Sequence, residues 1–331
     1  MKTINVVQIG LGPIGKKITQ IISKKKGIEV IGAVDISSDL KGKDLGEVCG
    51  LESMGINIHD TIKNCLNFQK PDAVILTTVS SFQQILPQIE EILSFSVPIV
   101  TTCEELSYSW ERFPDLSKKV DAIAKKQNVA VVSTGVNPGF LMDALPTFLT
   151  SVCQDLQYIR VERIQNAAFR RLPFQKKIGA GLSVEEFEVR KREGSLKHVG
   201  LQESIYAIAK KVGWIMTSVG ESIEPVLAQE TIETENLRIP LGHVAGVLQV
   251  AHGNIDKEIK IELIFRATIG DSSPRDLIEI KGTPSFKSLI DGGINGDVAT
   301  CAITINTVEQ ILNSRPGLRS MTDIPLVSFI Q

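Results

Sequence analysis

Apolar and polar positions along the chain change their period near residue 140, and this change divides the sequence into two parts. In the first part, short apolar runs alternate with stretches in which apolar residues recur every three or four positions. Such patterns predict strands and amphipathic helices that follow one another. Regular alternation of strand and helix predicts a parallel, doubly wound sheet of the α/β class. The predicted strands cover residues 4–9, 29–34, 73–78, 97–102 and 129–133.

After residue 140, the strands become longer and their apolar and polar residues alternate. Apolar side chains at every second position of 257–269 would line one face, and the other positions, which include Arg266, would line the opposite face. This alternation favours an open, mainly antiparallel sheet with one face on helices. The predicted elements are strands at 156–164, 226–238, 244–252 and 257–269, and helices at 183–192 and 201–212.

The first predicted strand is followed by GLGPIG, in which Gly10, Gly12 and Gly15 have the spacing of a dinucleotide-binding turn. The first glycine permits a sharp bend, the second lets the backbone approach a pyrophosphate, and the third lets the next helix pack closely. Asp35 lies 20 residues after Gly15, where a carboxylate can accept hydrogen bonds from the adenosine ribose. This acid favours NAD over NADP, while the nearby Lys41 leaves NADP use open.

Ligands of doubly wound sheets lie beyond the carboxyl ends of the strands. Three polar segments, at 77–81, 101–105 and 133–140, follow predicted strands, and we expect them to converge on the cofactor. The expected cofactor contacts are Gly10, Leu11, Gly12, Pro13, Ile14, Gly15, Asp35, Thr78, Val79, Ser80, Cys103 and Asn137.

The domain organisation follows from these patterns. We expect an NAD(P)-binding Rossmann domain over residues 1–141, completed by a C-terminal helix at about 296–331. Residues 142–295 are expected to form an α+β substrate-binding domain around an open mixed sheet.

Two adjacent acids, Glu104 and Glu105, come directly after the strand at 97–102. They could open a helix, because acids suit the positive end of a helix dipole. Alternatively, one of them could bind an ammonium group or serve as a general base. Both interpretations stay open at the level of the residues.

Arginines of the second part could hold a substrate carboxylate, because a guanidinium binds a carboxylate through two parallel hydrogen bonds. The candidates are Arg163, Arg170 in a basic, glycine-bearing loop at 170–183, and Arg266. For the loop, a solvated basic surface is the alternative.

Charge and composition exclude several classes. The formal net charge of −2 provides no basic field for nucleic acid. No apolar stretch reaches the ~20 residues of a membrane span, and the start lacks a signal-peptide pattern, so we expect a cytoplasmic protein. Five scattered cysteines without a CxxC pair suggest no disulfide framework, and the four histidines have no metal-ligand spacing.

The motifs GLGPIG, AVD…GKDLGEV, TTCEEL, TGVNPGFLMDALP, RRLPFQKKIGAG and GDVATCAITIN together resemble the 2,4-diaminopentanoate dehydrogenases and related amine dehydrogenases, a group similar to the dihydrodipicolinate reductases. The resemblance covers nearly the whole chain. It implies NAD(P)-dependent, reversible deamination of 2,4-diaminopentanoate to 2-amino-4-oxopentanoate with release of ammonia. It also implies a place in ornithine degradation and a homodimer that forms through the second domain.

The resemblance implies roles for individual residues as well. Glu104 would hold the amine and activate water, while Asn137 and Phe140 would line the nicotinamide side of the pocket. The substrate carboxylate gives a reason for an arginine in that pocket, with Arg163, Arg170 and Arg266 as the candidates.

Two departures bear on other reductases of this scaffold. Semialdehyde dehydrogenases place a nucleophilic cysteine where this chain has Phe140, so thiohemiacetal chemistry would need Cys103. Dihydrodipicolinate reductases carry a His-His pair, which is missing here, and a Ser-Gly-Thr loop, replaced here by residues 179–181, Gly-Ala-Gly. A dihydrodipicolinate-reductase-like enzyme, or another imine or semialdehyde reductase, stays the alternative. A non-enzymatic NAD-responsive regulator would need a DNA- or partner-binding part, which neither charge nor length supplies.

Overall fold

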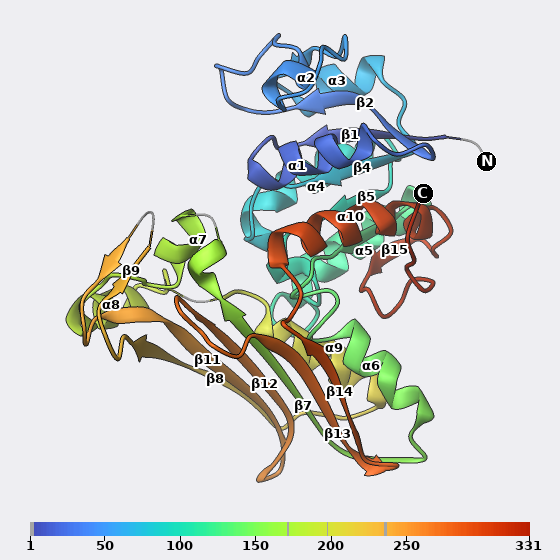
Figure 1. Cartoon of the computed structure of the whole chain (residues 1–331). Helices are drawn as coiled ribbons and strands as arrows, with labels where there is room; N and C mark the ends of the chain where they lie inside the picture. The colour runs from blue at the N-terminus through green and yellow to red at the C-terminus, as the bar shows by residue number, and fades with distance from the viewer. Residues whose placement is uncertain (1–2, 171, 197, 235–236) are drawn as a thin grey trace. The chain divides into compact units, whose positions relative to one another are not determined.

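The computed structural model describes residues 3–170, 172–196, 198–234 and 237–331. The chain divides into two compact units (Figure 1). Unit 1 comprises Met1–Phe140 and Asn295–Gln331, and unit 2 comprises Leu141–Ile294. Among the described residues, no helix combines the length and apolar character that crossing a membrane would require.

The sheet of unit 1 confirms the predicted parallel, doubly wound architecture. Its strand order is β15-β6-β5-β4-β1-β2-β3, and every paired neighbour is parallel. The short strands β3 and β15 were not predicted, because two or three residues carry too little period to be recognised. The strands are β1 (Ile4–Ile9), β2 (Ile28–Val34), β3 (Ile58–His59), β4 (Ala73–Leu76), β5 (Ile99–Thr101), β6 (Ala130–Ser133) and β15 (Gly317–Arg319).

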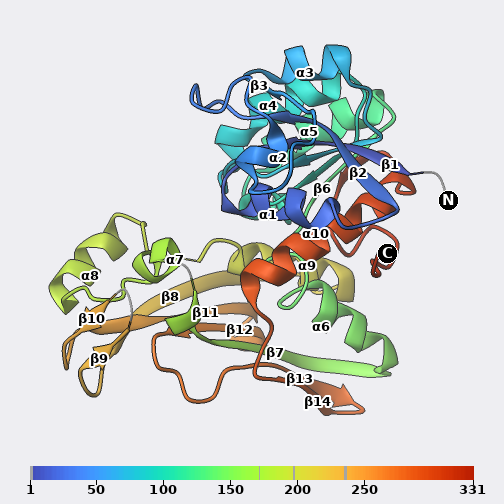
Figure 2. The same cartoon turned by 45° about the horizontal axis from the view of Figure 1, so that its top comes forward.

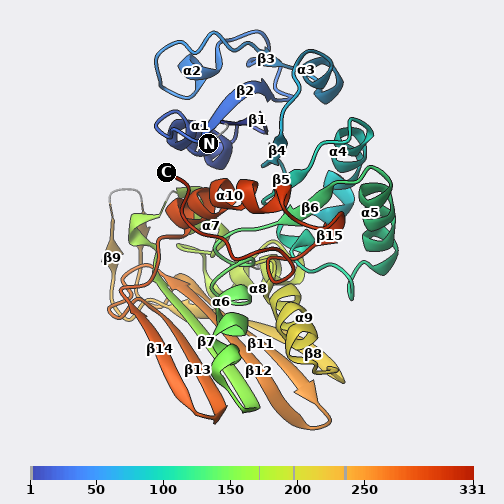
Figure 3. The ribbon, with the colours of Figure 1, turned by 90° about the vertical axis from the view of Figure 1, so that its right-hand side faces the viewer.

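Helices cover both faces of this sheet, and each face has its own apolar core (Figure 3). One core joins the sheet to α1 (Pro13–Ile22) and α10 (Gly296–Leu312), so the C-terminal helix does return to the first part of the chain. The other core contains α3 (Ile62–Phe68), α4 (Phe82–Ser94) and α5 (Pro114–Lys126). The short helices of this unit are α2 (Leu45–Val48) and the 3-10 turn η1 (Glu104–Leu106).

Helix α10 contributes one buried apolar stripe to this unit. Cys301, Ile305 and Val308 are buried, whereas Val298 and Leu312, in the first and last turns, are exposed.

Unit 2 contains a mixed sheet in the order β14-β13-β7-β12-β11-β8. Only β7 and β12 pair in parallel in this sheet; its other neighbours are antiparallel in the part of the chain that the structure describes. The open mixed sheet is therefore confirmed. Its strands are β7 (Asp155–Asn166), β8 (Ser218–Leu227), β11 (Val244–Ile255), β12 (Glu258–Thr268), β13 (Arg275–Thr283) and β14 (Phe286–Asp291).

Two predictions for this unit were wrong. The strand expected at 226–238 is displaced, since β8 ends at Leu227 and only the short ribbon β9 (Ile232–Glu233) and β10 (Arg238–Ile239) follows. The segment 170–183 is not simply a loop, because it contains α7 (Leu172–Lys177). The other helices are α6 (Ala144–Leu149), η2 (Thr150–Val152), η3 (Ala167–Phe169), α8 (Val184–Arg192) and α9 (Leu201–Val212).

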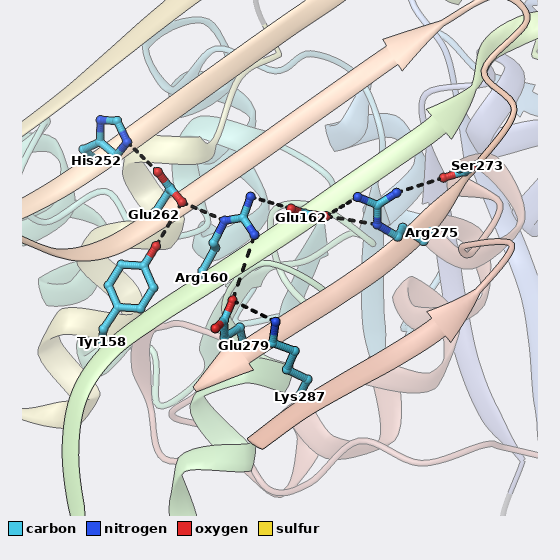
Figure 4. Close-up of polar contacts among 9 residues, drawn as sticks. All are labelled: Tyr158, Arg160, Glu162, His252, Glu262, Ser273, Arg275, Glu279 and Lys287. Atoms are coloured by element: carbon cyan, nitrogen blue, oxygen red, sulfur yellow. Dashed lines mark hydrogen bonds and ion pairs between the residues drawn. The ribbon is translucent and has the colours of Figure 1, made fainter. Parts of the chain in front are cut away.

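The two faces of this sheet have different surroundings. We call the face that packs against α9 the inner face (Figure 2). The packing is close: a Cβ atom on Gly253 would lie 2.7 Å from Cγ2 of Ile205. The opposite, outer face carries a network of polar and charged side chains from five strands, β11, β12, β7, β13 and β14 (Figure 4). This division decides which polar residues of the sheet can meet.

Candidate functional site

The glycine turn between β1 and α1 requires glycine at two positions for steric reasons. Gly10 has a φ of +88°, and a Cβ atom there would lie 2.6 Å from the carbonyl oxygen of Thr77. A Cβ atom on Gly15 would overlap the carbonyl oxygen of Gly10. Gly12 differs, because no atom lies within 4 Å of the place its Cβ would take. The backbone at Gly12 is therefore open to a ligand, which fits the close approach of a pyrophosphate.

Two buried side chains hold the turn in this shape. The Gln8 side-chain amide, fully buried, donates to the Gly10 carbonyl at 3.0 Å and to the Thr77 hydroxyl at 2.8 Å. Thr77 in turn donates to the same carbonyl at 2.9 Å. Sequence reasoning missed Gln8, although a glutamine inside an otherwise apolar strand is a visible signal.

Asp35 also belongs to this turn. Its carboxylate accepts hydrogen bonds from the backbone N–H of Leu11 at 2.7 Å and of Ser37 at 2.9 Å. The acid at the end of β2 is therefore fixed beside the GLG segment. In the first turn of α1, Pro13 has no backbone N–H, and Ile14 presents one of the N–H groups that a helix leaves without internal partners. Turn, helix end and acid together fit a dinucleotide, with the pyrophosphate at the helix end.

The structure brings the three polar segments together at the carboxyl edge of the sheet. Thr102 N–H donates to Leu76, and Thr134 N–H donates to Thr101 at 2.8 Å. Thr78 and Ser80 are exposed there, while Val79 packs against the apolar core. Segments 77–81, 101–105 and 133–140 thus lie beside one another, beyond the strand ends.

The two adjacent acids have different surroundings. The Glu105 carboxylate accepts a hydrogen bond from the backbone N–H of Phe82 at 2.8 Å, at the first residue of α4. The Glu105 backbone N–H also donates to the Ser80 carbonyl at 3.2 Å. Glu105 therefore joins the 77–81 segment to η1 and caps a helix other than the one that follows it. Glu104 is half-buried at the start of η1.

Cys103 is fully buried, and its thiol donates to the Ser80 carbonyl. Burial raises the pKa of this thiol far above its ordinary value, so the sulfur stays protonated. The thiol therefore has neither the access nor the charge of a nucleophile. Any cofactor contact at this position would involve its backbone.

The 133–140 segment forms a tight turn that is tied to α10. Gly139 has a φ of +123°, and a Cβ there would lie 2.6 Å from the backbone nitrogen of Gly135. Val136 N–H donates to the Thr300 hydroxyl on α10 at 3.2 Å. This turn places Asn137, which is buried, and Phe140, which is half-buried, in unit 1 with Glu104.

The inner face of the unit 2 sheet carries a buried row of mostly polar side chains. Register places Asp276, Arg163, Phe265 and Gln249 side by side on β13, β7, β12 and β11. All four are at most 3% exposed. Buried polar groups need partners. Arg163 and Asp276 pair with each other, whereas Gln249 binds backbone groups of His198.

Arg163 is held by Asp276 of this row and by the backbone carbonyl of Ile294. Its Nη1 donates to both oxygens of Asp276, at 2.9 and 3.1 Å, and its Nη2 donates to the Ile294 carbonyl at 3.0 Å. Burial raises the pKa of Asp276, although the Arg163 charge opposes that shift. The expectation that Arg163 contacts a substrate carboxylate is not supported by this geometry, since Asp276 already takes that place.

Arg170 has a different environment. Its Nη1 donates to the Gln165 side-chain oxygen at 2.9 Å, and its guanidinium carbon lies 4.0 Å from the centre of the Phe174 ring. It is only half-buried. Of the three candidate arginines, Arg170 therefore best combines access with a held orientation. Its sequence neighbour Arg171 lies outside the described residues.

His198 lies over the inner row. Its ring packs edge to face on Phe265 with centroids 4.4 Å apart, and Nδ1 lies 2.7 Å from the Val199 carbonyl. Burial and the nearby Lys177 lower the pKa of His198 to about 3, so the ring is neutral at ordinary pH. The Gln249 amide binds both backbone groups of His198, at 2.8 and 2.9 Å.

Arg266 lies on the outer face, opposite to Arg163. In the β7–β12 register, Arg266 pairs with Ile164, whereas Arg163 pairs with Phe265. Its Nε lies 3.3 Å from the Asp271 carboxylate. The three arginines therefore cannot hold one carboxylate together, because successive residues of a strand point to opposite faces.

Comparisons with known proteins agree on the family. Residues 140–331 match the model of the 2,4-diaminopentanoate dehydrogenase C-terminal domain, and residues 4–107 match that of the dihydrodipicolinate reductase N-terminus. A 2,4-diaminopentanoate dehydrogenase from Acetoanaerobium sticklandii is 29% identical over 98% of this chain and 94% of its own length.

Solved structures share the fold. The amine dehydrogenase from Mycobacterium smegmatis matches with a TM-score of 0.86 and 20% identity, over 98% of this chain and 97% of that one. The WlbA dehydrogenase from Bordetella pertussis, solved with NADH and UDP-GlcNAcA, matches with a TM-score of 0.55 and 12% identity, over 93% and 88% of the two chains.

Proposed function

The chain belongs to the 2,4-diaminopentanoate dehydrogenase C-terminal domain family, and on this premise we propose that it catalyses the NAD(P)-dependent oxidative deamination of 2,4-diaminopentanoate. The products are 2-amino-4-oxopentanoate, ammonia and NAD(P)H, and the reaction is reversible. The observation that carries this proposal is the similarity to the 2,4-diaminopentanoate dehydrogenase from Acetoanaerobium sticklandii. That alignment covers 98% of this chain and 94% of the relative. The glycine turn with Gly12 open to a ligand supports the cofactor.

Glu104 is the proposed catalytic base. The position of its neighbour Glu105 at the N-terminus of α4 supports this assignment. Glu105 is occupied at the start of α4, so of the two acids Glu104 is the one without a role in capping that helix. Glu104 takes a proton from the substrate ammonium, which frees the amine lone pair. A nicotinamide dinucleotide held at the Gly10–Gly15 turn and Asp35 would supply the acceptor for the hydride of the carbon that bears the amine. Glu104 passes this first proton to solvent and, again a carboxylate, takes a proton from water as it adds to the iminium. Glu104 then returns that proton to the carbinolamine nitrogen, which leaves as ammonia, and the hydroxyl proton is lost to solvent as the carbonyl forms.

Asp35 supports a preference for NAD. Its carboxylate lies beside Leu11 at the turn, where a ribose 2′-phosphate of NADP would meet a negative charge. We propose NAD as the main cofactor, with NADP as the weaker one.

Arg170 is the proposed contact for the substrate carboxylate. A half-buried guanidinium that is held by Gln165 and Phe174 is suited to recognise a planar anion. Asn137 and Phe140, on the tight turn of unit 1, are proposed to line the nicotinamide side of the pocket. The resemblance further supports a homodimer and a place in ornithine degradation.

The test is NADH formation, followed by its absorbance, with NAD+ and racemic 2,4-diaminopentanoate, and the same assay with NADP+. Equal amounts of NADH and ammonia are the expected result. Reduction of a cyclic imine or semialdehyde without any dependence on ammonia would instead establish the alternative reductase. The buried, protonated Cys103 speaks against a thiol-based semialdehyde reaction.

A further inference from the structure

The Gln165 side chain connects two parts of unit 2 through opposite ends of its amide. Its Oε1 accepts from Nη1 of Arg170 at 2.9 Å, and its Nε2 donates to the Ile294 carbonyl at 3.3 Å. An arginine can only donate, and a carbonyl can only accept. The amide therefore has one orientation that satisfies both neighbours, and the reversed orientation would lose both hydrogen bonds.

The Ile294 end of this connection is fixed by the buried ion pair. Arg163 donates to the Ile294 carbonyl at 3.0 Å, and the Ile294 N–H donates to Asp276 at 2.8 Å. Both backbone groups of Ile294 are thus held by side chains that are at most 3% exposed. Gln165, itself 9% exposed, therefore donates to the carbonyl of a residue that is held at both of its backbone groups.

The Arg170 end of the connection is the accessible one. Its guanidinium is held from one side by Gln165 and from another by the Phe174 ring. A long side chain that is already ordered loses less rotamer freedom when it binds a ligand. Preorganisation of this kind strengthens binding of a carboxylate without a new contact.

We propose that Gln165 is a positioning residue, which transmits the fixed geometry of the Arg163–Asp276 pair to Arg170 and so sets the preference for amines that carry a carboxylate. This inference rests on the proposed function, in which Arg170 binds the substrate carboxylate. Gln165 touches neither substrate nor cofactor in this role, and its effect is on substrate affinity alone.

The test compares two amines that differ in the carboxylate end, 2,4-diaminopentanoate and pentan-2-amine. Gln165→Met keeps the volume but removes both hydrogen bonds. It is expected to raise the KM for 2,4-diaminopentanoate by about 3- to 10-fold, the value of one or two hydrogen bonds, and to change kcat less than about twofold. The KM for pentan-2-amine should stay unchanged. Where turnover of pentan-2-amine is too slow to measure, its inhibition constant against 2,4-diaminopentanoate should stay unchanged instead. Gln157→Met, at an exposed position of the same strand, is the matched control.

Arg170→Met separates the two levels of the proposal. It should raise the same KM by about 10- to 100-fold, because a charged hydrogen bond is stronger, and Gln165→Met should add nothing further in the double variant. If Arg170→Met affects both amines equally, the carboxylate contact of the proposed function fails. If Arg170→Met discriminates but Gln165→Met does not, only the positioning role fails.

A general structural role for Gln165 predicts another pattern. Loss of kcat for both amines together with lower thermal stability would overturn the positioning role. If Gln165→Met does not fold, Gln165→Glu serves instead. It keeps an acceptor for Arg170 but neutralises the guanidinium, so the same selective rise in KM is expected, and equal KM values for wild type and variant would contradict the inference.

Discussion

The side chain of Glu105 accepts a hydrogen bond from the backbone N–H of Phe82 at 2.8 Å, across 23 positions of sequence. Of the two interpretations of the adjacent acids, this contact supports helix capping, and it does so for Glu105 alone. Glu105 does stabilise a helix end, as the electrostatic argument expected, but the helix is α4 and not the turn that directly follows. The proposed chemistry then falls to Glu104.

Glu104→Gln should lower kcat by at least about 100-fold, because a general base typically contributes this much. Binding of NADH, followed by its fluorescence, should be close to that of wild type. Glu111→Gln, an exposed acid in the same region, is the control. A Glu104→Gln enzyme with normal turnover would remove Glu104 from the mechanism.

Glu105→Ala should lower the free energy of unfolding by about 1–2 kcal/mol, because it removes the partner of a helix N-terminal N–H. Urea denaturation measures the change. Glu105→Gln keeps an acceptor oxygen and should recover most of the loss. An unchanged unfolding midpoint in Glu105→Ala would show that the cap contributes nothing.

Gly12→Ala and Gly15→Ala should fail in different ways. The methyl group of Gly12→Ala enters open space, so the fold should persist while the affinity for NADH falls severalfold. The methyl group of Gly15→Ala overlaps the Gly10 carbonyl oxygen, so thermal stability itself should fall by about 1–3 kcal/mol or more. Calorimetry and NADH titration of both variants distinguish the two effects. If Gly12→Ala binds NADH as tightly as wild type, the pyrophosphate does not lie against Gly12.

Arg163→Met should lower stability by about 3–5 kcal/mol, because it leaves Asp276 as an unpaired buried carboxylate. Arg163→Met combined with Asp276→Leu leaves no unpaired charge and should recover part of the loss. Chemical denaturation of wild type, Arg163→Met, Asp276→Leu and the double variant forms a double-mutant cycle. Additive losses in that cycle would mean that the two side chains are not coupled.

His198 should make the protein less stable in acid. Its pKa in the folded protein is lowered to about 3 from its ordinary value of 6.5, so between these values the unfolded chain binds more protons than the folded one. Stability is therefore unaffected by this group above pH 6.5 and decreases as the pH falls below it, by up to about 2 kcal/mol at pH 5.

Urea denaturation at pH 7.5 and pH 5 measures this effect. His198→Asn should show a smaller acid loss than wild type, and His59→Asn, at a partly exposed position, serves as the control. Equal acid losses in wild type and His198→Asn would rule out a neutral, buried His198.

Local patterns predicted the parallel sheet, the glycine turn and most helices, because these depend on residues close in sequence. The period of apolar positions identified α1, α4, α5 and α9, and the spacing of three glycines and one acid identified the dinucleotide turn. The short strands β3 and β15, the strands β13 and β14 and the displaced β8 escaped this approach, since their position depends on pairing partners far along the chain.

The sequence by itself thus determined the class of fold, the family and the segments that meet at the sheet edge. Only the tertiary structure decided which acid caps α4 and which arginine pairs with Asp276. It also placed Arg163 and Arg266 on opposite faces of one sheet. The reason is physical: whether a charged side chain caps a helix, pairs with another charge or faces a ligand depends on its neighbours in space. Those neighbours, such as Phe82 for Glu105 and Asp276 for Arg163, lie 23 and 113 positions away in the chain.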